Sequence, residues 1–105
     1  MKRMIFLAAV VAACAYRPAA ADPQSHTVAI QDFAYKPDPV TVSVGDTVVF
    51  ANHDPVGHTV TAKDGSFDSK NIESGKSWSY TFSTAGTYAY FCSVHPSMQG
   101  TITAQ

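Results

Sequence analysis

Apolar and polar residues alternate along most of the chain from residue 26 onward, as is typical of β-strands with one buried face. The alternation runs through residues 28–30, 40–44, 48–50, 78–82 and 87–92. We expect two further strands at residues 58–62 and 101–104, while a strand, a helical turn or a loop all remain open for residues 63–76. The pattern predicts an all-β fold, an antiparallel sandwich or barrel of about seven to eight strands.

The alternation of side chains in residues 87–92 predicts which way Cys92 points, because neighbouring side chains of a strand point to opposite faces. Tyr88, Tyr90 and Cys92 therefore share one face, and Ala89 and Phe91 share the other. If the tyrosines face the core, Cys92 also points inward at the end of its strand. We expect its sulfur to be held rigidly and shielded from bulk water.

The beginning of the chain differs in composition from the rest. Two basic residues are followed by an apolar segment at residues 4–15 and by small alanines at positions 19–21. This order is typical of a secretory signal peptide. We therefore assign residues 1–21 to a leader and residues 22–105 to a single domain.

Two further observations bear on where the protein resides. Residues 11–14 also fit a lipobox, in which Cys14 would carry a lipid and anchor the chain, as an alternative to free export. No apolar run in the sequence reaches the roughly 20 residues that a membrane-spanning helix needs. We expect a bacterial periplasmic protein with no membrane span.

The charge balance argues against one class of partner. Residues 22–105 carry four lysines and eight acidic residues, a net charge of −4 with neutral histidines. Nucleic-acid binding relies on basic patches that neutralise phosphates, so we expect no nucleic-acid partner. A mildly acidic chain would instead allow electrostatic steering toward a basic partner.

Cys92 is the only cysteine of residues 22–105, although exported proteins usually pair their cysteines. A lone thiol there needs either burial or a bound partner. His95 and Met98 follow at intervals of three residues, so a thiolate, an imidazole and a thioether share one short loop. Sulfur ligands favour Cu(I), and imidazole serves both copper oxidation states. Two histidines, one cysteine and a weakly bound methionine define a copper centre for electron transfer, so a second histidine is expected elsewhere.

Three histidines compete for this second position. His26 lies near the expected mature N-terminus, where little would fix its side chain. His53 lies in a loop rich in proline and glycine, whereas His58 begins an expected strand. Because a precise site needs rigid support, His58 is the predicted ligand and His53 the weaker candidate.

Two other chemistries use the same residue types. Zinc binds cysteine and histidine, but structural zinc sites usually contain more cysteines, and methionine is a poor zinc ligand. A cysteine nucleophile needs a histidine and an orienting group, and Met98 would then have no role. Copper accounts for more of the pattern than either alternative.

From about His26 to Gln105 the sequence resembles the cupredoxins, and most closely the amicyanin group among them. The matching stretches are residues 42–48, 58–60 and 86–100. The Cys-x2-His-x2-Met spacing is the most specific part of the resemblance. The resemblance implies a Greek-key β-sandwich that binds one type 1 copper ion, which alternates between Cu(I) and Cu(II). The implied ligands are His58, Cys92, His95 and Met98.

The resemblance also implies a function. Cupredoxins transform no substrate and shuttle single electrons, so we expect an electron carrier and not an enzyme. Electrons would pass at His95, inside an apolar patch formed by Val94, Pro96, Ser97, Pro55 and Val56. Expected partners are redox proteins that dock there, such as a c-type cytochrome or a periplasmic dehydrogenase, and the carrier would be a monomer. A periplasmic copper-binding or copper-delivery protein is the alternative function, and an adhesion module is a third hypothesis.

Two positions depart from the family pattern. Many members have asparagine directly after the first histidine ligand, where it helps to tie the ligand loops together, and Thr59 takes this place here. The amicyanin group has proline between the cysteine and the histidine, whereas Val94 carries an N–H. We expect the Val94 N–H to donate to the Cys92 sulfur, which would withdraw electron density and raise the reduction potential.

Overall fold

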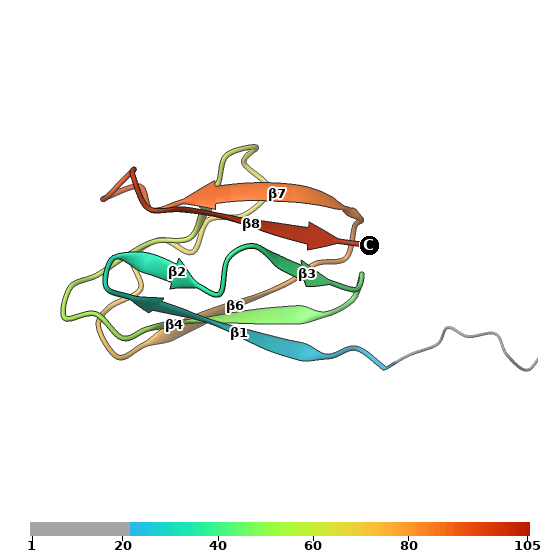
Figure 1. The fold of residues 1–105 in the computed structure, drawn as a ribbon, viewed down its shortest axis with the longest axis horizontal. Helices are drawn as coiled ribbons and strands as arrows, with labels where there is room; N and C mark the ends of the chain where they lie inside the picture. Colours follow the sequence, from blue (N-terminus) through green and yellow to red (C-terminus); the bar gives the residue numbers. More distant parts are fainter. Residues whose placement is uncertain (1–21) are drawn as a thin grey trace, which may run out of the picture.

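The computed structural model describes residues 22–105 and shows a sandwich of two sheets (Figure 1). The strands are β1 Ser25–Gln31, β2 Ala34–Lys36, β3 Val40–Val42, β4 Thr47–Asn52, β5 Thr61–Ala62, β6 Ser77–Thr81, β7 Gly86–Phe91 and β8 Gln99–Ala104. One sheet has the strand order β2-β1-β4-β6 and the other β3-β8-β7-β5. The predicted β-sandwich is confirmed. The expected leader and Cys14 lie outside the described residues.

Each sheet contains one parallel pair, which corrects the expectation of purely antiparallel sheets. β1 runs parallel to β4, and β3 runs parallel to β8, while the other neighbouring strands are antiparallel. The chain crosses to the second sheet for β3 and returns for β4, so β4 lies beside β1 in the same direction. Alternation of apolar side chains does not reveal strand direction, because its period is the same in both arrangements.

The core lies between the sheets and is filled by the side chains that alternation predicted to face inward. Val28, Ile30, Val48, Phe50 and Tyr90 are fully buried. Within residues 22–105, no helix is long and apolar enough to cross a membrane.

Val44 is the exception to this pattern. β3 ends at Val42, and the Val44 side chain is 44% exposed. The chain turns immediately afterwards at Gly45, whose φ of +100° favours glycine. The Asp46 carboxylate accepts the Ser43 N–H at 3.0 Å and so stabilises this turn.

The expected strand at residues 58–62 is shorter in the structure, where β5 comprises only Thr61–Ala62. Two backbone donors that a ladder would use are taken elsewhere. The Thr59 N–H donates to the Cys92 sulfur, and the Val60 N–H donates to the Ser69 hydroxyl.

The stretch from residue 63 to residue 76 forms no strand, although isolated bridges join residue 68 to Thr61 and residue 72 to His58. It nevertheless contributes two buried apolar side chains, Phe67 and Ile72, to the core. The stretch is therefore a packed loop.

Three connections meet at one end of the sandwich, opposite the C-terminus (Figure 1). They are the turn between β1 and β2, the loop that follows β4, and the loop between β7 and β8. These segments are far apart in the sequence, and the fold brings them together around the residues described next.

Candidate metal centre

Three of the predicted ligands converge at this end of the molecule. The Cys92 Sγ lies 3.7 Å from the Nδ1 of His58 and 3.8 Å from the Nδ1 of His95. The three ligand atoms all lie within 4.8 Å of one another. His58 and Cys92 are fully buried and His95 is half-buried, so the cluster reaches the surface only on the His95 side.

The pKa of the Cys92 thiol is lowered to about 6. Burial raises this pKa, but hydrogen bonds from the Thr59 N–H and from His95 outweigh it. Cys92 therefore favours the thiolate form at neutral pH, which is the form that binds metals. This is the only cysteine among the described residues.

Backbone hydrogen bonds close the loop between β7 and β8. The Cys92 N–H donates to the Met98 carbonyl at 3.1 Å, and the Met98 N–H donates to the His95 carbonyl at 2.9 Å. Met98 is 4% exposed, so its thioether is buried at the end of the same loop. The three loop residues therefore hold fixed positions relative to one another.

His58 is oriented from behind by a buried carboxylate. Its Nε2 lies 2.8 Å from Asp54 Oδ2. Burial opposes ionisation of Asp54, but hydrogen bonds from Phe33, His58 and Asp32 outweigh it and lower the pKa of this carboxyl group. An ionised carboxylate only accepts, so the His58 Nε2 carries the proton and Nδ1 presents a lone pair toward Cys92.

Thr59 joins the two ligand loops in the place where many relatives have asparagine. Its Oγ1 accepts the Ser93 N–H at 2.8 Å, and its own N–H donates to the Cys92 sulfur at 3.3 Å. A threonine hydroxyl therefore supplies a tie between the loops. The expected Val94 N–H donor to Cys92 is not among the hydrogen bonds found in residues 22–105, so that prediction is corrected. The Val94 side chain is 59% exposed at the surface.

The two other histidines lie apart from the cluster. His53 is exposed, and its N–H donates to the Ile30 carbonyl at 2.8 Å. The His26 ring contacts the Asp46 carboxylate at 2.9 Å, near the far end of β1. Neither contributes to the three-residue cluster.

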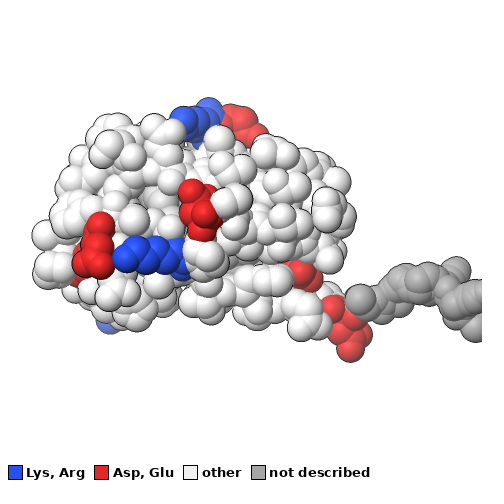
Figure 2. Space-filling model, viewed as in Figure 1, with Lys and Arg blue, Asp and Glu red and all other residues white. Residues whose placement is uncertain are grey.

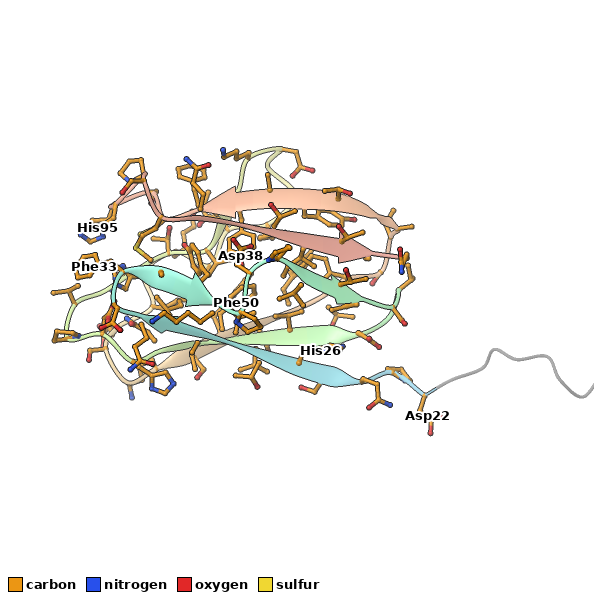
Figure 3. The ribbon with its side chains drawn as sticks, in the orientation of Figure 1. Asp22, His26, Phe33, Asp38, Phe50 and His95 are labelled. Atoms are coloured by element: carbon orange, nitrogen blue, oxygen red, sulfur yellow. The ribbon has the colours of Figure 1, made fainter. Side chains whose placement is uncertain are left out.

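Sequence reasoning missed Phe33, which lies in the turn between β1 and β2. Its ring centroid is 5.0 Å from that of His58 and 4.9 Å from that of His95, with edge-on geometry. Figure 3 shows the Phe33 and His95 side chains next to each other at this end. No local motif marks Phe33. Asp54 had one indication, since metal-binding histidines commonly donate their second ring N–H to a carboxylate and Asp54 is close in sequence to His58.

The donor set fits copper better than other metals. One thiolate and two imidazole Nδ1 atoms converge, and a buried thioether ends the same loop. This combination of soft sulfur and borderline nitrogen ligands is typical of electron-transfer copper sites. The residues present therefore fit copper.

Comparison with known proteins agrees with this geometry. The family model for the cupredoxin-like domain matches residues 3–104. An amicyanin from Paracoccus versutus is 32% identical over 80 residues, which cover 71% of this chain and 61% of that protein. A plastocyanin from Scenedesmus fuscus is 36% identical over 89 residues, which cover 68% of this chain and 86% of that protein.

Solved structures agree as well. A Cu(I) form of an amicyanin variant superposes with a TM-score of 0.71 at 32% identity, covering 81% of this chain and 85% of that one. A purple cupredoxin from Nitrosopumilus maritimus has a TM-score of 0.70 at 26% identity, covering 76% and 99%. The fold and the cluster of one cysteine and two histidines are those of a small copper-binding β-sandwich. The chain belongs to the cupredoxin family.

Proposed function

We propose that the protein is a copper-dependent electron carrier that binds one copper ion through His58, Cys92, His95 and Met98. The observation that carries this proposal is the convergence of a buried cysteine sulfur and two histidine Nδ1 atoms within 4.8 Å. Copper, when bound, would supply the one-electron Cu(I)/Cu(II) couple. No substrate is transformed, so the protein is not an enzyme.

The chain's own contribution is a rigid frame around the metal. His58 and Cys92 are fully buried, and hydrogen bonds to Asp54 and Thr59 fix them. Backbone hydrogen bonds fix the loop that carries His95 and Met98. A frame that moves little on gain or loss of an electron keeps reorganisation small, which favours fast transfer.

Electrons would pass at His95, the half-buried member of the cluster. Three apolar side chains at this end are well exposed, namely Phe33 at 48%, Val56 at 42% and Val94 at 59%. A redox partner would dock on this apolar surface, and electron-transfer contacts are typically small and transient, below about 1,200 Å². Figure 2 shows acidic and basic residues scattered over the visible face, with no large area of one sign.

The proposed cellular location and partners rest on the sequence. We propose that residues 1–21 direct export to a bacterial periplasm, where a c-type cytochrome or a periplasmic dehydrogenase would exchange electrons with the protein. Copper delivery is less consistent with the site, because a carrier must release its metal and Cys92 and His58 are fully buried. The mass of the protein recovered from the periplasm tests the setting: a chain beginning at Asp22 is expected, and a lipidated Cys14 would contradict free export.

Ligand variants test the proposed site. Replacing the sulfur in Cys92→Ser should abolish the intense visible thiolate-to-copper absorption of Cu(II)-loaded protein. The control is His53→Ala, which removes an exposed histidine of the neighbouring loop and should leave the band unchanged. Loss of the band in the control, or its persistence in Cys92→Ser, would contradict the assigned ligands.

A further inference from the structure

The turn between β1 and β2 has a backbone conformation that its residues seldom adopt. Asp32 and Phe33 have φ values of +56° and +57°. Left-handed backbone is uncommon outside glycine and is least expected for a bulky aromatic residue. Surrounding contacts must therefore hold this turn in place.

The contacts come from Asp54, in the loop that follows β4. Its Oδ1 accepts the Asp32 N–H at 2.7 Å, and its Oδ2 accepts the Phe33 N–H at 2.9 Å. The same Oδ2 binds the Nε2 of His58 at 2.8 Å. Asp54 is only 5% exposed, and its own N–H donates to Asn52 Oδ1 at 2.9 Å. One buried carboxylate therefore links the turn to a histidine of the metal centre.

The turn places the Phe33 ring against both histidines. Its centroid lies 5.0 Å from that of His58 and 4.9 Å from that of His95, and the planes are nearly perpendicular. Phe33 is 48% exposed, so its side chain also reaches solvent while its ring packs against both imidazoles. An exposed aromatic residue in an unfavourable backbone conformation is hard to explain by stability alone.

We propose that Asp54 is a positioning residue with two tasks, holding His58 with Nδ1 free for the metal and holding the turn so that Phe33 covers both histidine rings. The second task makes Phe33 a cover that limits the access of water and small ligands to the copper site. The role of Phe33 as a cover rests on the proposed function, because it concerns bound copper. The role of Asp54 in holding His58 and the turn concerns the metal-free chain.

The metal-free protein tests the first half by NMR. In the wild type, ¹⁵N shifts of the His58 ring should show the proton on Nε2. Asp54→Asn places an amide donor beside groups that donate, so Nδ1-protonated His58 should become populated and the Asp32 and Phe33 amides should exchange at least tenfold faster. The matched control is Asp64→Asn, because Asp64 accepts the Ser66 N–H on an exposed loop, and neither property should change. Wild-type His58 protonated on Nδ1, or unchanged amides in Asp54→Asn, would overturn the proposal.

The copper-loaded protein tests the cover. Phe33→Ala should speed copper removal by a chelator at least fivefold and let azide perturb the visible band at lower concentration. Phe33→Tyr keeps the ring and should behave like the wild type. The control is Val44→Ala, which truncates a similarly exposed apolar side chain beside the C-terminal residue Gln105, away from the metal centre. Equal rates of copper removal from Phe33→Ala and Val44→Ala would overturn the proposal that Phe33 covers the site.

A double variant tests the link between the two residues. If Asp54 places Phe33, the Asp54→Asn, Phe33→Ala double variant should lose copper no more than twofold faster than Asp54→Asn alone. Effects that multiply in the double variant would show that the residues act separately and would overturn the link. Should Asp54→Asn fail to fold, the ¹⁵N shifts of wild-type His58 still test how His58 is held. The variants of the exposed Phe33 still test whether it covers the copper site. Failure of wild-type protein to bind copper would instead defeat the proposed function and leave the metal-free NMR results interpretable.

Discussion

Among single residues, Thr59 joins the ligand loops by hydrogen bonds to Cys92 and Ser93. Its Oγ1 accepts the Ser93 N–H at 2.8 Å and lies 2.9 Å from the Thr61 hydroxyl. Thr59 is 4% exposed, whereas Ser93 is exposed. Water can replace part of the bond to the Ser93 N–H, so its loss should cost about as much as an ordinary hydrogen bond.

Thr59→Val keeps the shape of this side chain and removes the hydroxyl. Because the Ser93 N–H loses its protein acceptor, we expect the free energy of unfolding in urea to fall by about 0.5–1.5 kcal/mol. Thr59→Ser keeps the hydroxyl and should lose clearly less. Equal losses for the two variants would show that the methyl group, and not the tie to Ser93, accounts for the effect.

The residues of the candidate site also differ in how far the sequence alone could predict them. Cys92, His95 and Met98 were predictable as a group because a short loop forces them together. His58 required the further argument that it begins an expected strand and so has rigid support. Phe33 was not predictable, because its contact with the histidines depends on a left-handed turn that a distant carboxylate holds.

At the scale of elements, the β7–β8 pair supports the metal-binding loop and is tightly packed. Tyr90 lies opposite Gly100 in the register, two residues before Cys92. A Cβ at Gly100 would stand 2.5 Å from the Tyr90 ring, and Tyr90 is fully buried and has no room to move aside. Gly100 is therefore required by the close approach of a ring and not by its backbone conformation.

Gly100→Ala should lower the free energy of unfolding by about 1–3 kcal/mol, because it overpacks this position. Tyr90→Leu removes the atoms that the new methyl group would strike. The double variant should therefore be less destabilised than the sum of the two single variants. Strict additivity in thermal or urea unfolding would contradict the proposed clash.

Element boundaries were less predictable than element positions. The strand expected at residues 58–62 is only Thr61–Ala62, because the preceding backbone donors serve the metal centre and a neighbouring loop. Burial does not alternate there, since His58, Thr59 and Val60 are all buried. A strand predicted from residue types does not report the hydrogen-bond partners of its backbone.

At the scale of the whole molecule, the end opposite the metal centre has a buried carboxylate of its own. Asp46 is 4% exposed and accepts the Gln24 N–H at 2.8 Å and the Ser43 N–H at 3.0 Å. These bonds, together with the His26 ring, lower the pKa of Asp46 to about 2. The carboxylate thereby joins the segment before β1 to the turn between β3 and β4.

This pKa predicts the direction of acid sensitivity. A carboxyl group whose folded pKa is lowered stabilises the fold above its ordinary pKa, and this contribution is lost as pH falls through the folded value. The wild type should therefore lose stability from about pH 4 down to pH 2. Asp46→Asn should be less stable at neutral pH and should show a shallower decline in that range by chemical denaturation. An equally steep decline in the variant would contradict this role for Asp46.

The overall architecture was the most predictable level of all. Alternating apolar residues predicted a sandwich or a barrel, and the resemblance to the cupredoxins selected the sandwich. The motif around Cys92 predicted which end would bind metal. The parallel pairing of β1 with β4 and of β3 with β8 was missed, because it depends on the order in which the chain crosses between sheets. Local patterns carry no information on that order.

The most direct test of the electron-carrier proposal is a spectroelectrochemical titration of the copper-loaded protein. An intense visible thiolate-to-copper band should appear with one Cu(II) per chain. It should bleach on uptake of one electron and return fully on reoxidation through repeated cycles, with the metal retained throughout. Absence of the band, or release of copper on reduction, would contradict an electron carrier at this site.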